Sequence, residues 1–233
     1  MKKVYDFKAG EVLLVHKPLH WTSFDVVNKL RYHIKQKLGV KKIKVGHAGT
    51  LDPLADGLLI ICTGKKTKSI NDYMGLTKTY TGTITLGATT PSYDLETEID
   101  QTFPTENLNA EKIKAVAESM KGEYDQYPPI FSAKKIKGKK AYDLARAGEE
   151  VKLQSKLIHI NTFDLEKIDL PEVNFLIKCS KGTYIRSIAH DMGKHLNNGG
   201  HLTALRREAI GEFNLNEAKT VEEWLEIIQE NEL

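Results

Sequence analysis

The chain has 233 residues, of which 40% are hydrophobic and 28% are charged, and this balance is ordinary for a globular protein. That length allows one large domain or two smaller ones with sizeable cores. No stretch reaches the roughly 18 apolar residues of a membrane-spanning helix, and the first residues lack the apolar segment of a secretory signal. We therefore expect a cytoplasmic protein that does not enter a membrane.

The positive charges are unevenly spread, although the net charge of +3 argues only weakly for a polyanionic partner. Seven lysines or arginines and no acid lie between Lys29 and Lys44, and five lysines lie between Lys134 and Lys140. Such clusters suit a phosphate backbone. Taken alone, either cluster is equally well explained as a solvated basic face.

Hydrophobic spacing predicts strands at residues 11–15, 58–62, 79–86 and 173–179. Residues 79–86 alternate strictly, with Tyr80 on the apolar face and threonines on the other, which predicts a half-buried antiparallel strand. Gly82 lacks a side chain beside Tyr80 and leaves room there for a ligand. The cysteines Cys62 and Cys179 both fall in such apolar runs, which favours free thiols over a disulfide or a metal site.

Helical spacing predicts a helix that begins after Thr22 or Ser23 and ends at Gly39, further helices over 109–122 and 185–196, and an amphipathic terminal helix that starts with a capping box of Thr220 and Glu223. The acidic stretch 94–100 is predicted to be an exposed loop or hairpin tip. Prolines, glycine and lysines at 126–140 predict a mobile arm, which a short helix at 141–147 follows.

One turn-rich stretch, residues 44–59, holds three glycines, a proline, one imidazole and a central carboxylate. Pro53 restricts its own φ and biases Asp52 towards an extended backbone, so the carboxylate is held stiffly ahead of the apolar run 58–62. A carboxylate on a rigid loop is a candidate for chemistry, and a turn cap is the simpler explanation. From spacing alone both remain open.

Residues 46–59, Gly-His-Ala-Gly-Thr-Leu-Asp-Pro-Leu-Ala-Asp-Gly-Leu-Leu, resemble the catalytic motif of the TruB-type tRNA pseudouridine synthases. The resemblance continues at Lys17-Pro18, Lys78-Thr79-Tyr80, Pro128-Pro129, and residues 180–186 and 201–207, and spans nearly the whole chain. It implies an α+β fold with a mixed, largely antiparallel sheet, flanking helices and a central RNA-binding cleft. It also implies a single catalytic domain over 1–233, with a thumb-like basic insertion at 126–148 and no additional C-terminal RNA-binding domain.

The resemblance assigns roles to individual residues. Asp52 is the catalytic carboxylate, Arg186 is the arginine that pairs with it, and Tyr80 stacks on the target uracil and handles a proton. Tyr184 lines the uracil pocket, and the remaining substrate-binding or RNA-binding candidates are His47, Leu205, Lys17, Lys134, Lys135, Lys137, Lys139 and Lys140. The family resemblance places His47 in the space that the flipped nucleotide leaves, and Lys17 with Pro18 in support of the active-site loop. Arg206 and Arg207 are candidates for phosphate contacts.

The activity implied is isomerisation of the T-loop uridine of tRNA to pseudouridine, which needs no metal and no cofactor because no redox step occurs. We expect tRNA, through its T-arm, as the partner of a monomer with no obligate protein partner. A guide-RNA-dependent, dyskerin-like synthase and a tRNA-folding chaperone are the alternatives. The first depends on a C-terminal module for which this chain has no room, and the second leaves the three catalytic candidates unexplained. A carbohydrate hydrolase would need a second well-placed carboxylic acid.

Overall fold

The structure is a computed structural model, and it describes residues 4–132, 135–136, 139–140 and 153–232. Of the predicted arm, Lys134, Lys137 and the helix at 141–147 therefore lie outside the described residues. Lys135, Lys139 and Lys140 are described only as backbone, in the paired strands β8 (Lys135–Ile136) and β9 (Lys139–Lys140).

The chain divides into two compact units, Met1–Tyr80 with Arg206–Leu233 and Thr81–Leu205. Two strands, β4 (Lys78–Leu86) and β12 (Gly200–Ile210), contribute residues to both units. The expectation of a single catalytic domain stays a prediction, and each unit is described by itself.

The first unit is built on a sheet in the order β14–β1–β3–β12, with β2 also paired to β3. Its strands are β1 (Val12–Lys17), β2 (Val45–His47), β3 (Ala55–Thr63), β13 (Phe213–Asn214), β14 (Lys219–Thr220) and the end of β12. β1 pairs antiparallel with β3 over the whole length of β1, from Val12 opposite Cys62 to Lys17 opposite Gly57, whereas β14 runs parallel to β1. The loop with Asp52 is thus the link between β2 and the central strand.

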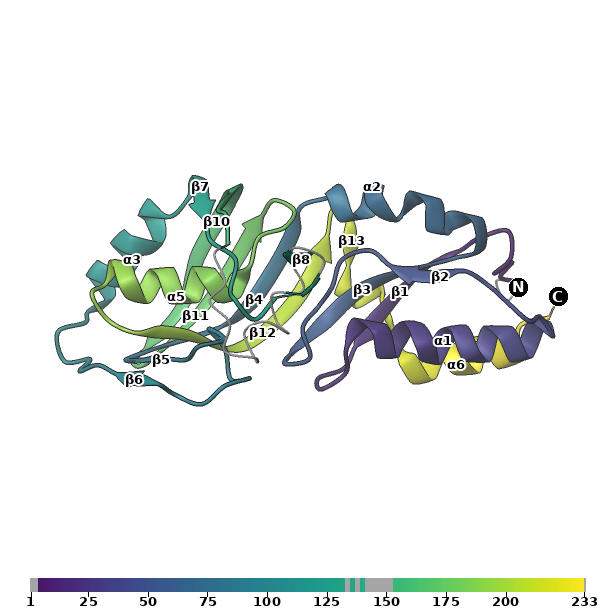
Figure 1. The fold of residues 1–233 in the computed structure, drawn as a ribbon, viewed down its shortest axis with the longest axis horizontal. Helices are drawn as coiled ribbons and strands as arrows, with labels where there is room; N and C mark the ends of the chain where they lie inside the picture. Colours follow the sequence, from purple (N-terminus) through teal and green to yellow (C-terminus); the bar gives the residue numbers. More distant parts are fainter. Residues whose placement is uncertain (1–3, 133–134, 137–138, 141–152, 233) are drawn as a thin grey trace. The chain divides into compact units, whose positions relative to one another are not determined.

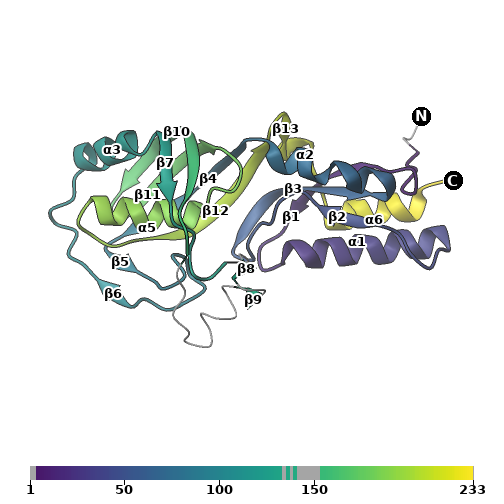
Figure 2. The ribbon, with the colours of Figure 1, turned by 45° about the horizontal axis from the view of Figure 1, so that its top comes forward.

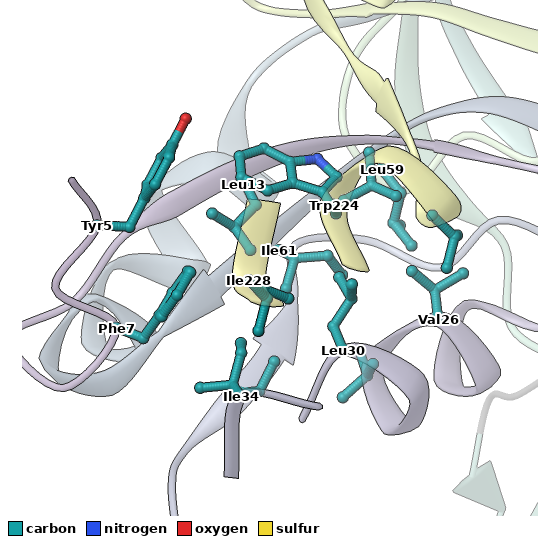
Figure 3. Close-up of a cluster of buried hydrophobic side chains, with 14 residues drawn as sticks. Tyr5, Phe7, Leu13, Val26, Leu30, Ile34, Leu59, Ile61, Trp224 and Ile228 are labelled. Atoms are coloured by element: carbon teal, nitrogen blue, oxygen red, sulfur yellow. The ribbon is translucent and has the colours of Figure 1, made fainter. Parts of the chain in front are cut away.

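Helices cover both faces of this sheet, as Figure 1 shows for the half that carries the two termini. Alternate residues of β1 and β3 pack against α1 (Ser23–Leu38) and α6 (Val221–Glu230), where Leu30, Ile61 and Trp224 meet in one buried cluster (Figure 3). The other face of β3 packs against α2 (Ile70–Gly75), which follows the 3-10 helix η1 (Gly64–Ser69). A second 3-10 helix, η2 (Leu215–Glu217), precedes β14.

The helix ends follow the sequence signals. Thr22 caps α1 in a capping box with Asp25, and Gly39 ends the helix in the left-handed region at φ 60°. Thr220 and Glu223 form a second capping box at the start of α6. Both predicted ends of α1 and the predicted start of α6 are therefore confirmed.

The second unit is built on a sheet in the order β12–β4–β11–β10–β7. Its remaining strands are β5 (Ala88–Thr89), β6 (Gln101–Thr102), β7 (Gly122–Gln126), β10 (Lys156–Asp169) and β11 (Glu172–Cys179). β10 pairs antiparallel with both β11 and β7. The helices α3 (Ala110–Ser119) and α5 (Ile185–His195) lie together on this unit (Figure 2). Helices and largely antiparallel strands confirm the predicted α+β class.

Two sequence interpretations in this unit need correction. A Cβ at Gly82 would lie 2.3 Å from the Ala204 carbonyl oxygen and 2.8 Å from the Phe175 ring. The glycine therefore makes room for β12 and β11, not for a ligand. Asp94, expected in an exposed loop, is buried at 5% exposure, although most residues after it are exposed. Among the described residues, no helix is both long and apolar enough to span a membrane.

Candidate active site

The loop between β2 and β3 carries Asp52, and Ser23 fixes it from the start of α1. The Ser23 hydroxyl donates to the Leu51 carbonyl at 3.0 Å, and the Leu51 N–H donates to the Ser23 oxygen at 2.8 Å. Leu51 is buried, whereas Asp52 is half-buried. The residue before the carboxylate is therefore anchored in the core, while the carboxylate itself stays accessible.

Arg207, on β12, holds the same loop through its guanidinium, which donates to three backbone carbonyls. Nε donates to Leu58 at 2.7 Å, Nη1 to Thr50 at 3.3 Å and Nη2 to Gly49 at 3.2 Å. Gly57 permits this approach, because a Cβ there would lie 2.4 Å from the Arg207 carbonyl oxygen. Arg207 is only 1% exposed, so the suggestion that it meets phosphates is wrong. Arg207 thus holds the backbone of the loop from the protein interior, and we call this set of three bonds the Arg207 clamp.

Lys17 at the end of β1 is completely buried, with its ammonium turned into the protein. Nζ donates to the Pro18 carbonyl at 2.8 Å and to the Trp21 carbonyl at 2.7 Å. Burial lowers the pKa of Lys17 to about 8, although the nearby carboxylates of Asp56 and Asp52 act to raise it. The sequence grouped Lys17 with the RNA-binding residues, and its placement fits support of the turn before α1.

Asp56, four residues after Asp52, is engaged by two cationic or ionisable side chains. Arg206 donates to it from Nε at 3.1 Å and from Nη2 at 2.6 Å, and the Nε2 atom of His16 lies 3.4 Å away. Burial by itself raises the pKa of the Asp56 carboxyl, but Arg206 and His16 hold it below its usual range. Asp56 is thus engaged in an ion pair with Arg206.

His47 and Tyr80 complete the candidates in the first unit. His47 ends β2 opposite Ile61 and is half-buried. Burial and the charge of Arg207 hold the pKa of His47 below its usual range, so the imidazole is neutral near pH 7. Tyr80 lies on β4 and is 8% exposed.

In the second unit, Arg186 stands in the first turn of α5 and is 5% exposed. Its Nε atom lies 3.5 Å from Oδ2 of Asp94, and Nη1 donates to the carbonyls of Ser92 at 3.2 Å and Phe131 at 3.0 Å. Between Ser92 and Asp94, Tyr93 adopts φ 65°, which is uncommon for a residue other than glycine. This turn places the Ser92 carbonyl and the Asp94 carboxylate against the Arg186 guanidinium.

Tyr184 and Leu205 also belong to the second unit, and both are half-buried. The backbone of Tyr184 is fixed on both sides by Gln126, whose Oε1 accepts from the Tyr184 N–H at 2.7 Å and whose Nε2 donates to its carbonyl at 3.0 Å. Leu205 lies on β12, two residues before Arg207. Gln126, which is 2% exposed, was not singled out in the sequence.

Two buried residues that hold the candidates, Asp94 and Arg207, could not be recognised as such from the sequence. Asp94 follows Thr90 and Ser92 at a spacing of two residues, and all three are buried because their polar groups are bonded within the turn. That alternation was the available signal, yet small polar residues beside an acidic run read as solvent-exposed. Arg207 had no signal beyond its place in a strand.

The described residues include no group of three His, Cys, Asp or Glu side chains that could hold a metal ion. Among the candidates, the first unit holds a half-buried carboxylate on an anchored loop, a tyrosine and a neutral imidazole, and the second unit holds a buried arginine and a second tyrosine. Carboxylates, imidazoles and tyrosine hydroxyls are side chains that can take part in nucleophilic or proton-transfer steps.

Comparison with known proteins finds similarity over nearly the whole chain. The family model for the N-terminal domain of TruB family pseudouridylate synthases matches residues 35–185, and that for the tRNA pseudouridylate synthase B C-terminal domain matches residues 186–232. The tRNA pseudouridine synthase B of Phocaeicola vulgatus is 54% identical over 228 residues, which cover 98% of this chain and 97% of that protein. Its namesake from Flavobacterium johnsoniae is 56% identical over 214 residues, which cover 91% and 93%.

A solved structure, that of a Cbf5-Nop10-Gar1 complex, resembles this chain with a TM-score of 0.70 at 26% identity. The match covers 94% of this chain but only 54% of the solved chain, so this chain spans about half the length of that relative. Both family models and the near full-length curated relatives lead to one conclusion. The chain belongs to the TruB family of pseudouridylate synthases.

Proposed function

We propose that this chain converts the T-loop uridine of tRNA to pseudouridine, with Asp52 as the catalytic carboxylate. The observation that carries the proposal is the anchored loop: Ser23 holds Leu51 just before Asp52, and Arg207 bonds the carbonyls of Thr50 before it and Leu58 after it, while Asp52 itself is half-buried. The relatives named tRNA pseudouridine synthase B, at 54% and 56% identity, supply the substrate class.

The reaction exchanges one bond for another within the nucleotide. The N1–C1′ glycosidic bond breaks, the uracil turns, a C5–C1′ bond forms, and the proton on C5 leaves while N1 gains one. The ionised Asp52 carboxylate either attacks C1′ or removes the C2′ proton to give a glycal, and both routes balance without a cofactor. The anchored loop would hold the carboxylate at the ribose in either case.

Arg186 is proposed as the partner that keeps Asp52 ionised when RNA excludes water from the site. A neighbouring guanidinium lowers the pKa of a carboxyl by roughly 1–3 units. The contacts with Asp94 and with the carbonyls of Ser92 and Phe131 orient that guanidinium within its own unit. A planar fork so held suits a carboxylate better than an ammonium would.

The other candidates are proposed to handle the base and the RNA. Tyr80 stacks on the uracil and assists the loss of the C5 proton, and Tyr184 and Leu205 line the pocket. Because the target lies in a folded loop, its nucleotide is flipped out, and the neutral His47 fills the vacated space. Lys17 supports the turn before α1 through its bonds to the Pro18 and Trp21 carbonyls, and that turn meets the loop where the His20 N–H donates to the Pro53 carbonyl at 2.7 Å.

The T-arm of tRNA is the proposed partner, and the lysines of the arm, Lys134, Lys135, Lys137, Lys139 and Lys140, are its proposed phosphate contacts. We further propose a monomer that acts in the cytoplasm without an obligate protein partner. A guide-RNA-dependent role is less well supported, because the relative solved with Nop10 and Gar1 is 26% identical, whereas the relatives named tRNA pseudouridine synthase B are 54% and 56% identical.

The experiment is incubation of purified protein with a tRNA transcript that carries tritium at C5 of its uridines. Formation of the C5–C1′ bond releases that tritium to water, so the proposal predicts release of one equivalent per tRNA, with pseudouridine mapped to the T-loop. A matched transcript with cytidine at the target position should release none. Absence of release from the uridine substrate would refute the proposed function.

A further inference from the structure

One flank of α1 carries aromatic and basic side chains in a stripe beside the buried face of the helix, and no role described so far uses it. Phe24, Asn28, Arg31 and Lys35 recur every three or four residues and so share one side of the helix, with Tyr32 beside them. The buried side of α1, with Val26, Val27, Leu30 and Ile34, faces the core instead. We name Phe24, Arg31, Tyr32 and Lys35 the α1 stripe.

Large aromatic rings in this stripe are exposed to solvent. Phe24 is 58% exposed and Tyr32 is 59% exposed, although both could have been replaced by polar residues without loss to the core. The guanidinium carbon of Arg31 lies 5.8 Å from the centroid of the Phe24 ring, and Nη2 of Arg31 donates to Asn28. The arginine is thus ordered above an aromatic face, not extended into solvent.

The α1 stripe continues into a basic groove of about 550 Å³, lined by Arg31, Lys35, Lys41, Lys42, Ile43 and Lys44. Five of these six residues are cationic and none is acidic, although the whole chain carries a net charge of only +3. Such a concentration of charge attracts a polyanion. Exposed aromatic rings beside it add a surface on which flat groups can stack.

The stripe starts beside the catalytic loop of the same unit. Ser23, which precedes Phe24, is bonded to Leu51, the residue before Asp52. From Ser23 to Lys35 the helix advances about 18 Å. An RNA strand that reaches Asp52 can therefore follow α1 away from the site.

We infer that the α1 stripe binds unpaired nucleotides of the RNA substrate, with bases stacked on Phe24, Tyr32 and the Arg31 plane and phosphates on the groove lysines. Single-stranded RNA is bound in this way, by aromatic side chains and arginine planes beside a positively charged groove. This inference rests on the proposed function for the identity of the RNA. It adds a binding surface to which neither the resemblance nor the proposed mechanism assigns a role.

The test measures RNA affinity as a function of salt in an Asp52→Asn background, so that conversion of the substrate does not contribute. The probes are the unmodified tRNA transcript and a labelled oligouridylate of about ten nucleotides, within the usual site size for a single strand. Combined Phe24→Ala and Tyr32→Ala substitutions should raise both dissociation constants at least five-fold at every salt concentration and leave the salt slope unchanged. The controls Phe24→Tyr and Tyr32→Phe keep the rings and should bind within about two-fold of the parent.

Lysine substitutions, unlike the aromatic ones, should change the salt dependence of RNA binding. Lys35→Gln with Lys42→Gln should flatten the log–log salt slope for the oligouridylate by up to about 1.4, because each phosphate contact with a single strand contributes about 0.7. Lys114→Gln, on the exposed side of α3 in the other unit, is the matched control and should leave the slope unchanged. Thermal unfolding of every variant checks that these exposed substitutions leave the fold intact.

Unchanged affinity in the aromatic double variant would overturn the inference. Equal losses of RNA affinity in the alanine and the ring-conserving variants would also overturn it. A third contradicting result is a dimer of the parent without RNA that dissociates in the alanine variant, because the stripe would then join two copies of the chain. Tritium release by the wild-type protein is a separate measurement. If wild type releases no tritium, the proposed function fails. If wild type releases tritium but the aromatic double variant binds RNA as tightly as the parent, only this inference is refuted.

Discussion

Arg207→Lys tests whether the loop that carries Asp52 is held by the buried guanidinium. Arg207 donates to the carbonyls of Leu58, Thr50 and Gly49, and each hydrogen bond from a charged donor is worth about 1.5–3 kcal/mol. The single ammonium of lysine can keep one of these three bonds, so the variant should lose about 3–6 kcal/mol of unfolding free energy. Total stabilities are about 5–15 kcal/mol, so the variant should fold yet be clearly weakened.

The assay is urea denaturation, together with hydrogen exchange of the Ala48 amide, which donates to the Ile60 carbonyl at the base of the loop. Arg206→Lys is the matched control on the same strand, because Arg206 is 49% exposed and its ion pair with Asp56 is worth no more than about 1 kcal/mol. A loss in Arg207→Lys no larger than in Arg206→Lys would refute the clamp. Unchanged exchange at Ala48 would do the same.

Three further substitutions test the rest of the site. In Arg186→Lys, an ammonium replaces the planar guanidinium that contacts Asp94 and two carbonyls, so the single-turnover rate should fall roughly 100-fold. A near-normal rate would show that the guanidinium is not needed. Tyr80→Phe keeps the ring and loses the hydroxyl, so tRNA binding should stay within a few-fold while turnover falls at least roughly 100-fold; normal turnover would reduce Tyr80 to a stacking surface. For Lys17, whose folded pKa is about 8 against 10.5 unfolded, the folded chain holds fewer protons between those pH values, so stability should rise with pH there by up to about 1.4 kcal/mol per unit. Urea midpoints from pH 7 to 10 should show this rise in wild type and not in Lys17→Met, and equal pH slopes would contradict the burial of the charge.

The helix boundaries and central strands could be predicted because their signals are local. The cap at Thr22, the stop at Gly39 and the alternation around Tyr80 each depend on residues within one turn or strand. The family motif likewise lies in one continuous stretch, so Asp52 could be proposed as the catalytic carboxylate without any knowledge of the fold.

The partners of the site residues could not be predicted in the same way, because they come from distant parts of the chain. Arg207 meets Gly49 across 158 positions, and its charge suggested a phosphate contact until burial showed otherwise. Asp94 was taken for an exposed acid, since nothing local shows that a turn strained at Tyr93 directs it to Arg186. Long-range pairing, not local propensity, decides these positions.

The central claim is that the Asp52 carboxylate performs the isomerisation, and Asp52→Asn tests it most directly. The substitution keeps the size and hydrogen-bonding shape of the side chain and removes its charge. We predict that the variant binds unmodified tRNA within a few-fold of wild type and forms no pseudouridine in a single-turnover experiment in which wild type converts the T-loop uridine. A variant that retains roughly a tenth of the wild-type rate, a loss of only about 1.4 kcal/mol, would contradict the account.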